Sequence, residues 1–118
     1  MTSRNVYFLS SRTAITAETL GQSLLAQFPD VRFSVVTIPY IDSVQKAEII
    51  VKRINRESQQ TELKPIVIST LADVSISQII HQSDALVLDL FERILPDIES
   101  LLNQHLLDRA DEILWSLD

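Results

Sequence analysis

Hydroxyl groups and one cation gather directly after the first apolar strand that the sequence predicts, at residues 5–9. Ser10, Ser11, Arg12 and Thr13 follow this strand and precede a predicted helix. A guanidinium beside hydroxyl groups, at a helix start with free N–H groups, suits a phosphate or a sulfate. The loop therefore predicts an anion site. The plainer interpretation is that Thr13 caps the helix and Arg12 lies in solvent.

Polar residues also follow the other predicted strands. Asp42 and Ser43 come after the second strand, Ser69 and Thr70 after the third, and Asp89 ends the fourth. Ligands of parallel sheets bind beyond the carboxyl ends of the strands, so these five residues are candidates for the rim of the same site. The alternative is that Asp42 and Ser43 only cap a helix, and that Asp89 is solvated or caps the helix after it.

Several other kinds of site lack the residues they need. The chain has no cysteine, which excludes disulfides, thiolate catalysis and cysteine metal sites. His81 and His105 stand far apart with no ligand spacing around them, so we expect no metal site. No serine has an evident histidine and acid partner for a hydrolytic triad. Gly21 is the only glycine, which excludes the glycine-rich phosphate loops.

Composition predicts one folded, soluble domain. The chain has 118 residues, of which 46% are hydrophobic and 22% are charged. Its net charge of -6 argues against nucleic acid and anionic membrane surfaces as partners. No apolar run approaches the roughly 18 residues that span a membrane, and no signal peptide is visible. We expect a cytoplasmic protein, which the lack of cysteine also fits.

Strands and helices alternate along the chain. The predicted strands cover residues 5–9, 31–38, 66–68 and 85–88. The predicted helices cover residues 15–28, 43–54, 73–83 and 91 to the end. Short apolar strands alternating with helices are typical of an α/β fold, here a four-stranded parallel sheet with helices on both faces. We favour the strand order 2-1-3-4, an α/β domain over residues 1–100, and a helical tail over residues 101–118.

Apolar stripes predict which sides of the first two helices are buried. The first stripe is Ala17, Leu20, Leu24, Leu25 and Phe28, and the second is Val44, Ala47, Val51 and Ile54. Gly21 lies on the first stripe. Because glycine inside a helix costs about 1 kcal/mol relative to alanine, we expect Gly21 to face the sheet at a close contact.

The tail has its own apolar stripe. Leu106, Ala110, Ile113 and Leu117 share one side of a continuous helix, and Trp115 points away from them. An exposed tryptophan on an acidic helix indicates an interface, so we predict a homodimer through the tail. The alternative is that Trp115 packs back onto its own domain or is simply exposed.

Six blocks of the sequence have the order and the spacing of a known family. They are residues 13–21, 23–29, 37–43, 53–55, 65–71 and 84–91. Over about residues 5–100 the chain resembles the amino-terminal domain of the pyruvate,water dikinase (phosphoenolpyruvate synthase) regulatory proteins. In one respect it departs from them: the family usually has Ser-Asp-Gly-Thr where this chain has Ser10-Ser11-Arg12-Thr13. A hydroxyl and a cation thus replace an acid and a flexible glycine.

The resemblance implies a function for the complete protein. Family members use ADP to phosphorylate a threonine of the dikinase, and use phosphate to remove that group with release of pyrophosphate. Their phosphate-binding loop lies in a second domain. For this chain the resemblance implies substrate recognition and completion of an active site, with no cofactor of its own and phosphoenolpyruvate synthase or a related dikinase as partner. ADP and phosphate belong to a full-length relative. The alternative is a truncated relative that acts alone as a binding module.

Overall fold

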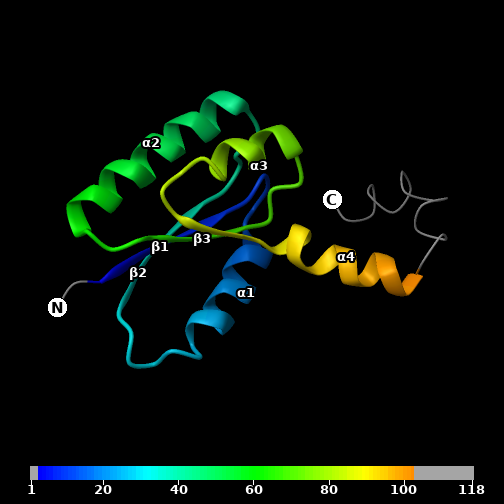
Figure 1. The fold of residues 1–118 in the computed structure, drawn as a ribbon, viewed down its shortest axis with the longest axis horizontal. Coiled ribbons are helices and arrows are strands. Elements are labelled where there is room, and N and C mark those ends of the chain that lie inside the picture. Colours follow the sequence, from blue (N-terminus) through cyan, green and yellow to red (C-terminus); the bar gives the residue numbers. More distant parts are fainter. Residues whose placement is uncertain (1–2, 103–118) are drawn as a thin grey trace.

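Four short apolar strands form one parallel sheet at the centre of the structure (Figure 1). This computed structural model describes residues 3–102. The elements in chain order are β1 (Arg4–Leu9), α1 (Ile15–Leu25), β2 (Phe33–Ile38), α2 (Val44–Thr61), β3 (Ile66–Ser69), α3 (Val74–Ile80), β4 (Leu86–Asp89) and α4 (Leu90–Leu102). The strand order is β2-β1-β3-β4, which confirms the predicted fold class and order. All four strands therefore end at one edge of the sheet.

Helices α2 and α3 cover one face of the sheet, and together they enclose the larger core. Tyr7 and Leu9 of β1 and Val67 of β3 point to this face, where they meet Ile54 of α2 and Ile80 of α3. All five side chains are almost completely buried. Side chains alternate between the faces of a strand, so the neighbours of these strand residues build the second core.

The second core lies on the opposite face, beneath α1 and the start of α4. Val6 and Phe8 of β1 and Ile68 of β3 pack there against Ala17 and Leu90. Gly21 also faces this core, as predicted. A Cβ atom built on Gly21 would lie 2.4 Å from Cε1 of Phe8, so only a residue without a side chain allows this approach of helix and strand.

The predicted stripe of α1 is partly wrong. Ala17 is buried and Leu25 is half-buried, but Leu20, Leu24 and Phe28 are 42%, 45% and 58% exposed. The small residues Ala17 and Gly21 bring α1 close to the sheet, which leaves Leu20 and Leu24 on a flank that no other described element covers. Phe28 lies beyond the end of the helix.

The stripe of α2 is largely confirmed, and Ile50 widens it. Ala47 and Ile54 are buried as predicted, and Ile50 is buried while Val51 is only half-buried. Val44 stands at the helix start and is half-buried. Val51 still packs against the core, and the close packing of α2 against α3 accounts for the burial of Ile50.

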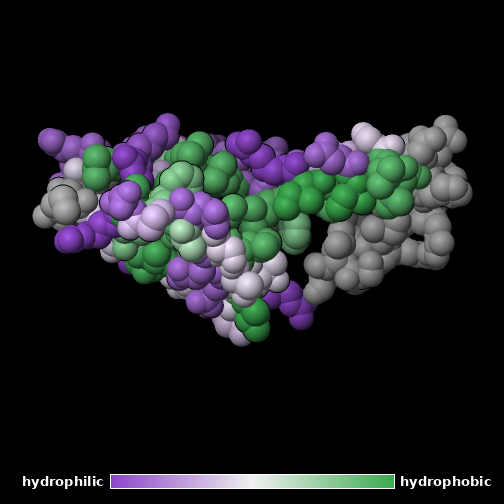
Figure 2. All heavy atoms as spheres, turned by 90° about the horizontal axis from the view of Figure 1, so that it is seen from below, coloured by the Kyte–Doolittle hydropathy of each residue, from purple (hydrophilic) through white to green (hydrophobic). Residues whose placement is uncertain are grey.

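Helix α4 leaves the body of the domain on one side (Figure 1). It continues through Pro96, although proline lacks the N–H that a helix interior uses. Its exposed apolar residues are Ile94, Ile98, Leu101 and Leu102. Figure 2 shows apolar surface running along α4 and continuing onto the body of the domain.

The predicted boundary at residue 100 falls inside α4. The tail stripe of Leu106, Ala110, Ile113 and Leu117, together with Trp115 and His105, lies outside the described residues. The tail helix and its homodimer therefore stay predictions. Within residues 3–102, no helix combines the length and the apolar character that a membrane span needs.

Candidate functional site

The loop after β1 lies at the carboxyl edge of the sheet and is tied to the neighbouring strand ends. The Ser10 carbonyl accepts a hydrogen bond from the Ile41 N–H at 2.9 Å, and the Arg12 carbonyl accepts one from the Tyr40 N–H, also at 2.9 Å. The Thr70 N–H donates to the Leu9 carbonyl at 3.0 Å. These bonds hold the ends of β1, β2 and β3 in one fixed arrangement.

Residues 10–16 line a hollow of about 210 Å³ at this edge, with Thr70, Ala72 and Phe91 as its other walls. We call it the loop hollow. All four predicted anion-site residues, Ser10, Ser11, Arg12 and Thr13, line it, and so does the rim candidate Thr70. Ser10 is buried, and its Oγ accepts a hydrogen bond from the Arg12 N–H at 3.1 Å. Arg12 and Thr13 are exposed.

The start of α1 carries no side-chain cap. Ala14 is the N-cap residue, it has a left-handed backbone with φ 69°, and no side chain accepts a hydrogen bond from the first turn. The interpretation of Thr13 as a cap is therefore wrong. Because the first N–H groups of a helix have no partner inside it, those of α1 stay available at the loop hollow, where the positive end of the helix dipole also lies.

The rim candidates of β2 have structural roles. Ser43 caps α2, since its Oγ accepts a hydrogen bond from the Lys46 N–H at 3.1 Å. Asp42 forms an ion pair with Lys46 at 2.8 Å, and the hydrogen bond and charge of Lys46 lower the pKa of Asp42. Neither residue lines the loop hollow. Ser69 is buried, and its Oγ accepts from the Leu71 N–H at 3.2 Å, which shapes the turn after β3.

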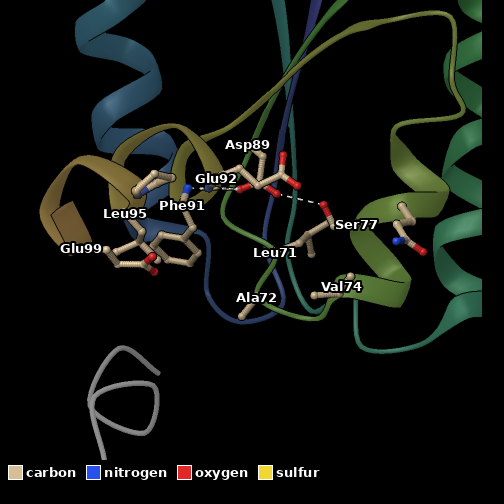
Figure 3. Close-up of a pocket in the computed structure, with 11 residues that line it drawn as sticks. Leu71, Ala72, Val74, Ser77, Asp89, Phe91, Glu92, Leu95 and Glu99 are labelled. Atoms are coloured by element: carbon tan, nitrogen blue, oxygen red, sulfur yellow. Dashed lines mark hydrogen bonds between the residues drawn. The ribbon is translucent and has the colours of Figure 1, made fainter. Parts of the chain in front are cut away.

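Asp89 is a buried carboxylate, only 3% exposed, at the end of β4. Its Oδ1 accepts hydrogen bonds from the Phe91 N–H at 3.1 Å and the Glu92 N–H at 3.2 Å. Its Oδ2 accepts one from the Ser77 Oγ at 2.9 Å (Figure 3). The carboxylate therefore caps α4, as the alternative interpretation held, and also links β4 to α3.

A second cavity, of about 300 Å³, opens between α3 and α4 next to Asp89 (Figure 3). Leu71, Val74, Phe91 and Leu95 supply apolar walls, and Asp89, Glu92 and Glu99 supply acids. We call it the acidic groove. Sequence reasoning missed it, although one signal was present: Glu92, Leu95 and Glu99 recur at helical spacing just after a strand end.

Known proteins match this chain over nearly its whole length. The sequence profile of the kinase/pyrophosphorylase family matches residues 6–114. The chain belongs to the kinase/pyrophosphorylase family. A relative from Pseudomonas fluorescens (strain Pf0-1), named "Putative phosphoenolpyruvate synthase regulatory protein", is 43% identical over 102 residues, which are 86% of this chain and 38% of the relative.

Two further relatives with the same name extend the comparison. The protein of Azoarcus sp. (strain BH72) is 43% identical over 118 residues, 98% of this chain and 43% of the relative. The protein of Legionella pneumophila (strain Corby) is 46% identical over 101 residues, 86% of this chain and 37% of the relative. The chain thus spans about two-fifths of the length of these relatives. Both cavities lie within the residues that the family profile matches.

His81 lies close to Asp89 and Glu92, two acids of the acidic groove. Its Nε2 lies 3.3 Å from Oε2 of Glu92, and ligand atoms of His81, Asp89 and Glu92 lie within 4.8 Å of one another. We expected no metal site from the sequence. Both oxygens of Asp89 also accept hydrogen bonds, and the contact of His81 with Glu92 links the end of α3 to α4.

Proposed function

We propose that this domain recognises the protein substrate and completes the active site of a kinase/pyrophosphorylase that regulates phosphoenolpyruvate synthase. The names of the relatives and the family profile support the regulatory role. The main support for the role proposed for this domain is the loop hollow. Arg12, three hydroxyl residues and an uncapped helix start lie together there. In this proposal ADP and phosphate are ligands of a complete protein, and the loop hollow takes the phosphoryl group of the substrate.

The chemistry of the loop hollow suits a phosphoryl group. Arg12 offers a planar fork of N–H donors that pairs with phosphate oxygens. Ser11 and Thr13 offer hydroxyl donors, and the start of α1 offers backbone N–H groups with a favourable dipole. Phosphoryl transfer depends largely on positioning and on charge stabilisation, and this is what such donors provide.

Phosphate-dependent thermal stabilisation tests the loop hollow. At a phosphate concentration about tenfold above Kd, binding stabilises the native state by about 1.4 kcal/mol, which raises the melting temperature by several degrees. We expect Arg12→Ala to lose most of this shift. The matched control is Arg32→Ala, an exposed arginine just before β2, at the opposite edge of the sheet. An undiminished shift in Arg12→Ala would show that Arg12 is an ordinary surface residue.

The exposed apolar side of α4 supports a second candidate, an interaction module that acts alone. A contiguous apolar surface on a soluble protein usually marks a contact with another protein. Ile94, Ile98 and Leu101 provide such a surface here. Affinity capture of purified phosphoenolpyruvate synthase by this chain, with no other part of a regulatory protein present, would favour this candidate. If only a full-length relative captures phosphoenolpyruvate synthase, the first proposal is favoured.

A further inference from the structure

We infer that the acidic groove binds a segment of a partner protein in which apolar side chains alternate with lysine or arginine. The inference deepens the proposed function, because it states the chemistry of the segment that is recognised. It rests on the proposal that this domain binds a protein substrate. Its test uses no phosphate, so that it can fail independently of the loop hollow.

The acidic side chains of the groove support the lysine or arginine residues of the proposed segment. Glu92 and Glu99 are exposed on the side of α4 that lines the groove, and no lysine or arginine is among the lining residues. Three hydrogen bonds already satisfy Asp89, whereas the Glu92 side chain is 65% exposed. Within residues 3–102, Glu99 forms no ion pair, and the only ionic contact of Glu92 is with His81. Negative charge without lysine or arginine attracts a cationic ligand and disfavours an anionic one.

The apolar walls of the groove support the apolar side chains of the proposed segment. Leu71 forms a buried wall, Phe91 and Leu95 are half-buried, and Val74 is 69% exposed. A cavity of about 300 Å³ is at the small end of the usual range for ligand pockets, enough for a few side chains. An apolar side chain that enters between α3 and α4 covers Val74 and Leu95. Its cationic neighbours then lie beside Glu92 and Glu99.

The two cavities adjoin each other. Ala72 and Phe91 line both the acidic groove and the loop hollow. The loop hollow contains the cation Arg12, so it favours an anionic group of a ligand. The groove contains the acids of α4, so it favours a cationic group. A protein segment that lies along this edge therefore has one orientation in which both charge preferences are met.

Three short peptides with blocked ends test the inference on the intact chain. The first alternates leucine with lysine, the second alternates serine with lysine, and the third alternates leucine with glutamate. Titration by calorimetry or fluorescence anisotropy gives each Kd. We expect binding of the leucine–lysine peptide with a Kd below about 1 mM, and binding at least about tenfold weaker for the other two.

Charge-neutral variants locate the site. An exposed ion pair contributes up to about a fivefold change in affinity. Glu99→Gln should therefore raise the Kd of the leucine–lysine peptide by about two- to fivefold. The matched control is Glu48→Gln, an exposed glutamate of α2 that does not line the groove, which should leave Kd unchanged. The inference is overturned if the leucine–lysine peptide does not bind at about 1 mM, if the serine–lysine peptide binds equally well, or if both variants weaken binding equally.

Discussion

Substitution of Gly21 by alanine tests the packing of α1 on the sheet with a single methyl group. The new Cβ would lie 2.4 Å from Cε1, 2.6 Å from Cζ and 3.0 Å from Cδ1 of Phe8. Ordinary contacts between carbon atoms are about 3.5–4.0 Å, so the ring or the helix must move. Phe8 has little room to give way, because it is completely buried among Val6, Ala17, Ile68 and Leu90.

Two effects of opposite sign set the magnitude. Alanine has a helix propensity that is better than that of glycine by about 1 kcal/mol. Overpacking a buried site costs about 1–3 kcal/mol, and the short distances to three ring atoms favour the upper part of this range. We expect Gly21→Ala to lower the free energy of unfolding by about 1–2 kcal/mol, and Gly21→Leu to lower it further. Each kcal/mol lowers the melting temperature by about 4–8 °C in a domain of about this size.

Urea unfolding followed by circular dichroism measures the change. The matched control is Gln22→Ala, an exposed position one residue along the same helix, which we expect to be neutral or slightly stabilising. A double-mutant cycle with Phe8→Leu isolates the contact, because the smaller side chain makes room for the new methyl group. Gly21→Ala should then cost less in the Phe8→Leu background than in the wild type.

One result would refute the reasoning. If Gly21→Ala stabilises the protein as Gln22→Ala does, and the cycle shows no coupling to Phe8, then α1 does not press this position against β1. The register of α1 on the sheet would have to change, and with it the position of the loop hollow.

Two further predictions concern Tyr7 and the tail. Burial and the hydrogen bond to Glu57, 2.6 Å long, raise the pKa of Tyr7, and the same bond together with Arg53 lowers the pKa of Glu57. Tyr7→Phe should therefore cost about 1 kcal/mol near pH 7. A lowered carboxyl pKa stabilises the fold above its unfolded value of about 4.3, so this cost should shrink as the pH falls below about 4, measured by urea unfolding at both pH values. For the tail, sedimentation at about 100 μM should show a homodimer in the wild type and a monomer in Trp115→Ala; a monomeric wild type would contradict the tail prediction.

The fold was predictable from the sequence because its strands are short apolar runs separated by helices. The apolar stretch at Tyr7 and Phe8 predicted a strand buried on both faces, and it became a central strand of the sheet. Gly21 was predicted to face the sheet because its low helix propensity needs a compensating contact. The flank of α1 was not predictable. Leucines at positions 20 and 24 match an apolar stripe equally well whether a neighbouring element covers them or not.

The candidate site was predictable only where one loop supplies it. Residues 10–13 are consecutive, so the sequence itself brings them together around the loop hollow. The acidic groove instead combines the turn after β3, the side of α3 and the side of α4. Three separate segments meet there through the packing of tertiary structure, which no local pattern specifies. For the same reason the approach of His81 to Glu92 was not visible in the sequence.

The backbone around the loop hollow is held in a conformation that its residue types disfavour. Ala14 and Tyr40 both have a left-handed backbone, with φ of 69° and 59°. Each costs about 1–2 kcal/mol in a residue with a Cβ atom. Ala14 also leaves the start of α1 without a side-chain cap. Ala14 lines the loop hollow, and the Tyr40 N–H donates a hydrogen bond to the Arg12 carbonyl. Both strained residues therefore contact this loop. Unfavourable backbone that collects in one place is characteristic of ligand sites, where the surrounding structure maintains it. This strain accords with the proposed anion site at the loop hollow, where the start of α1 has no side-chain cap.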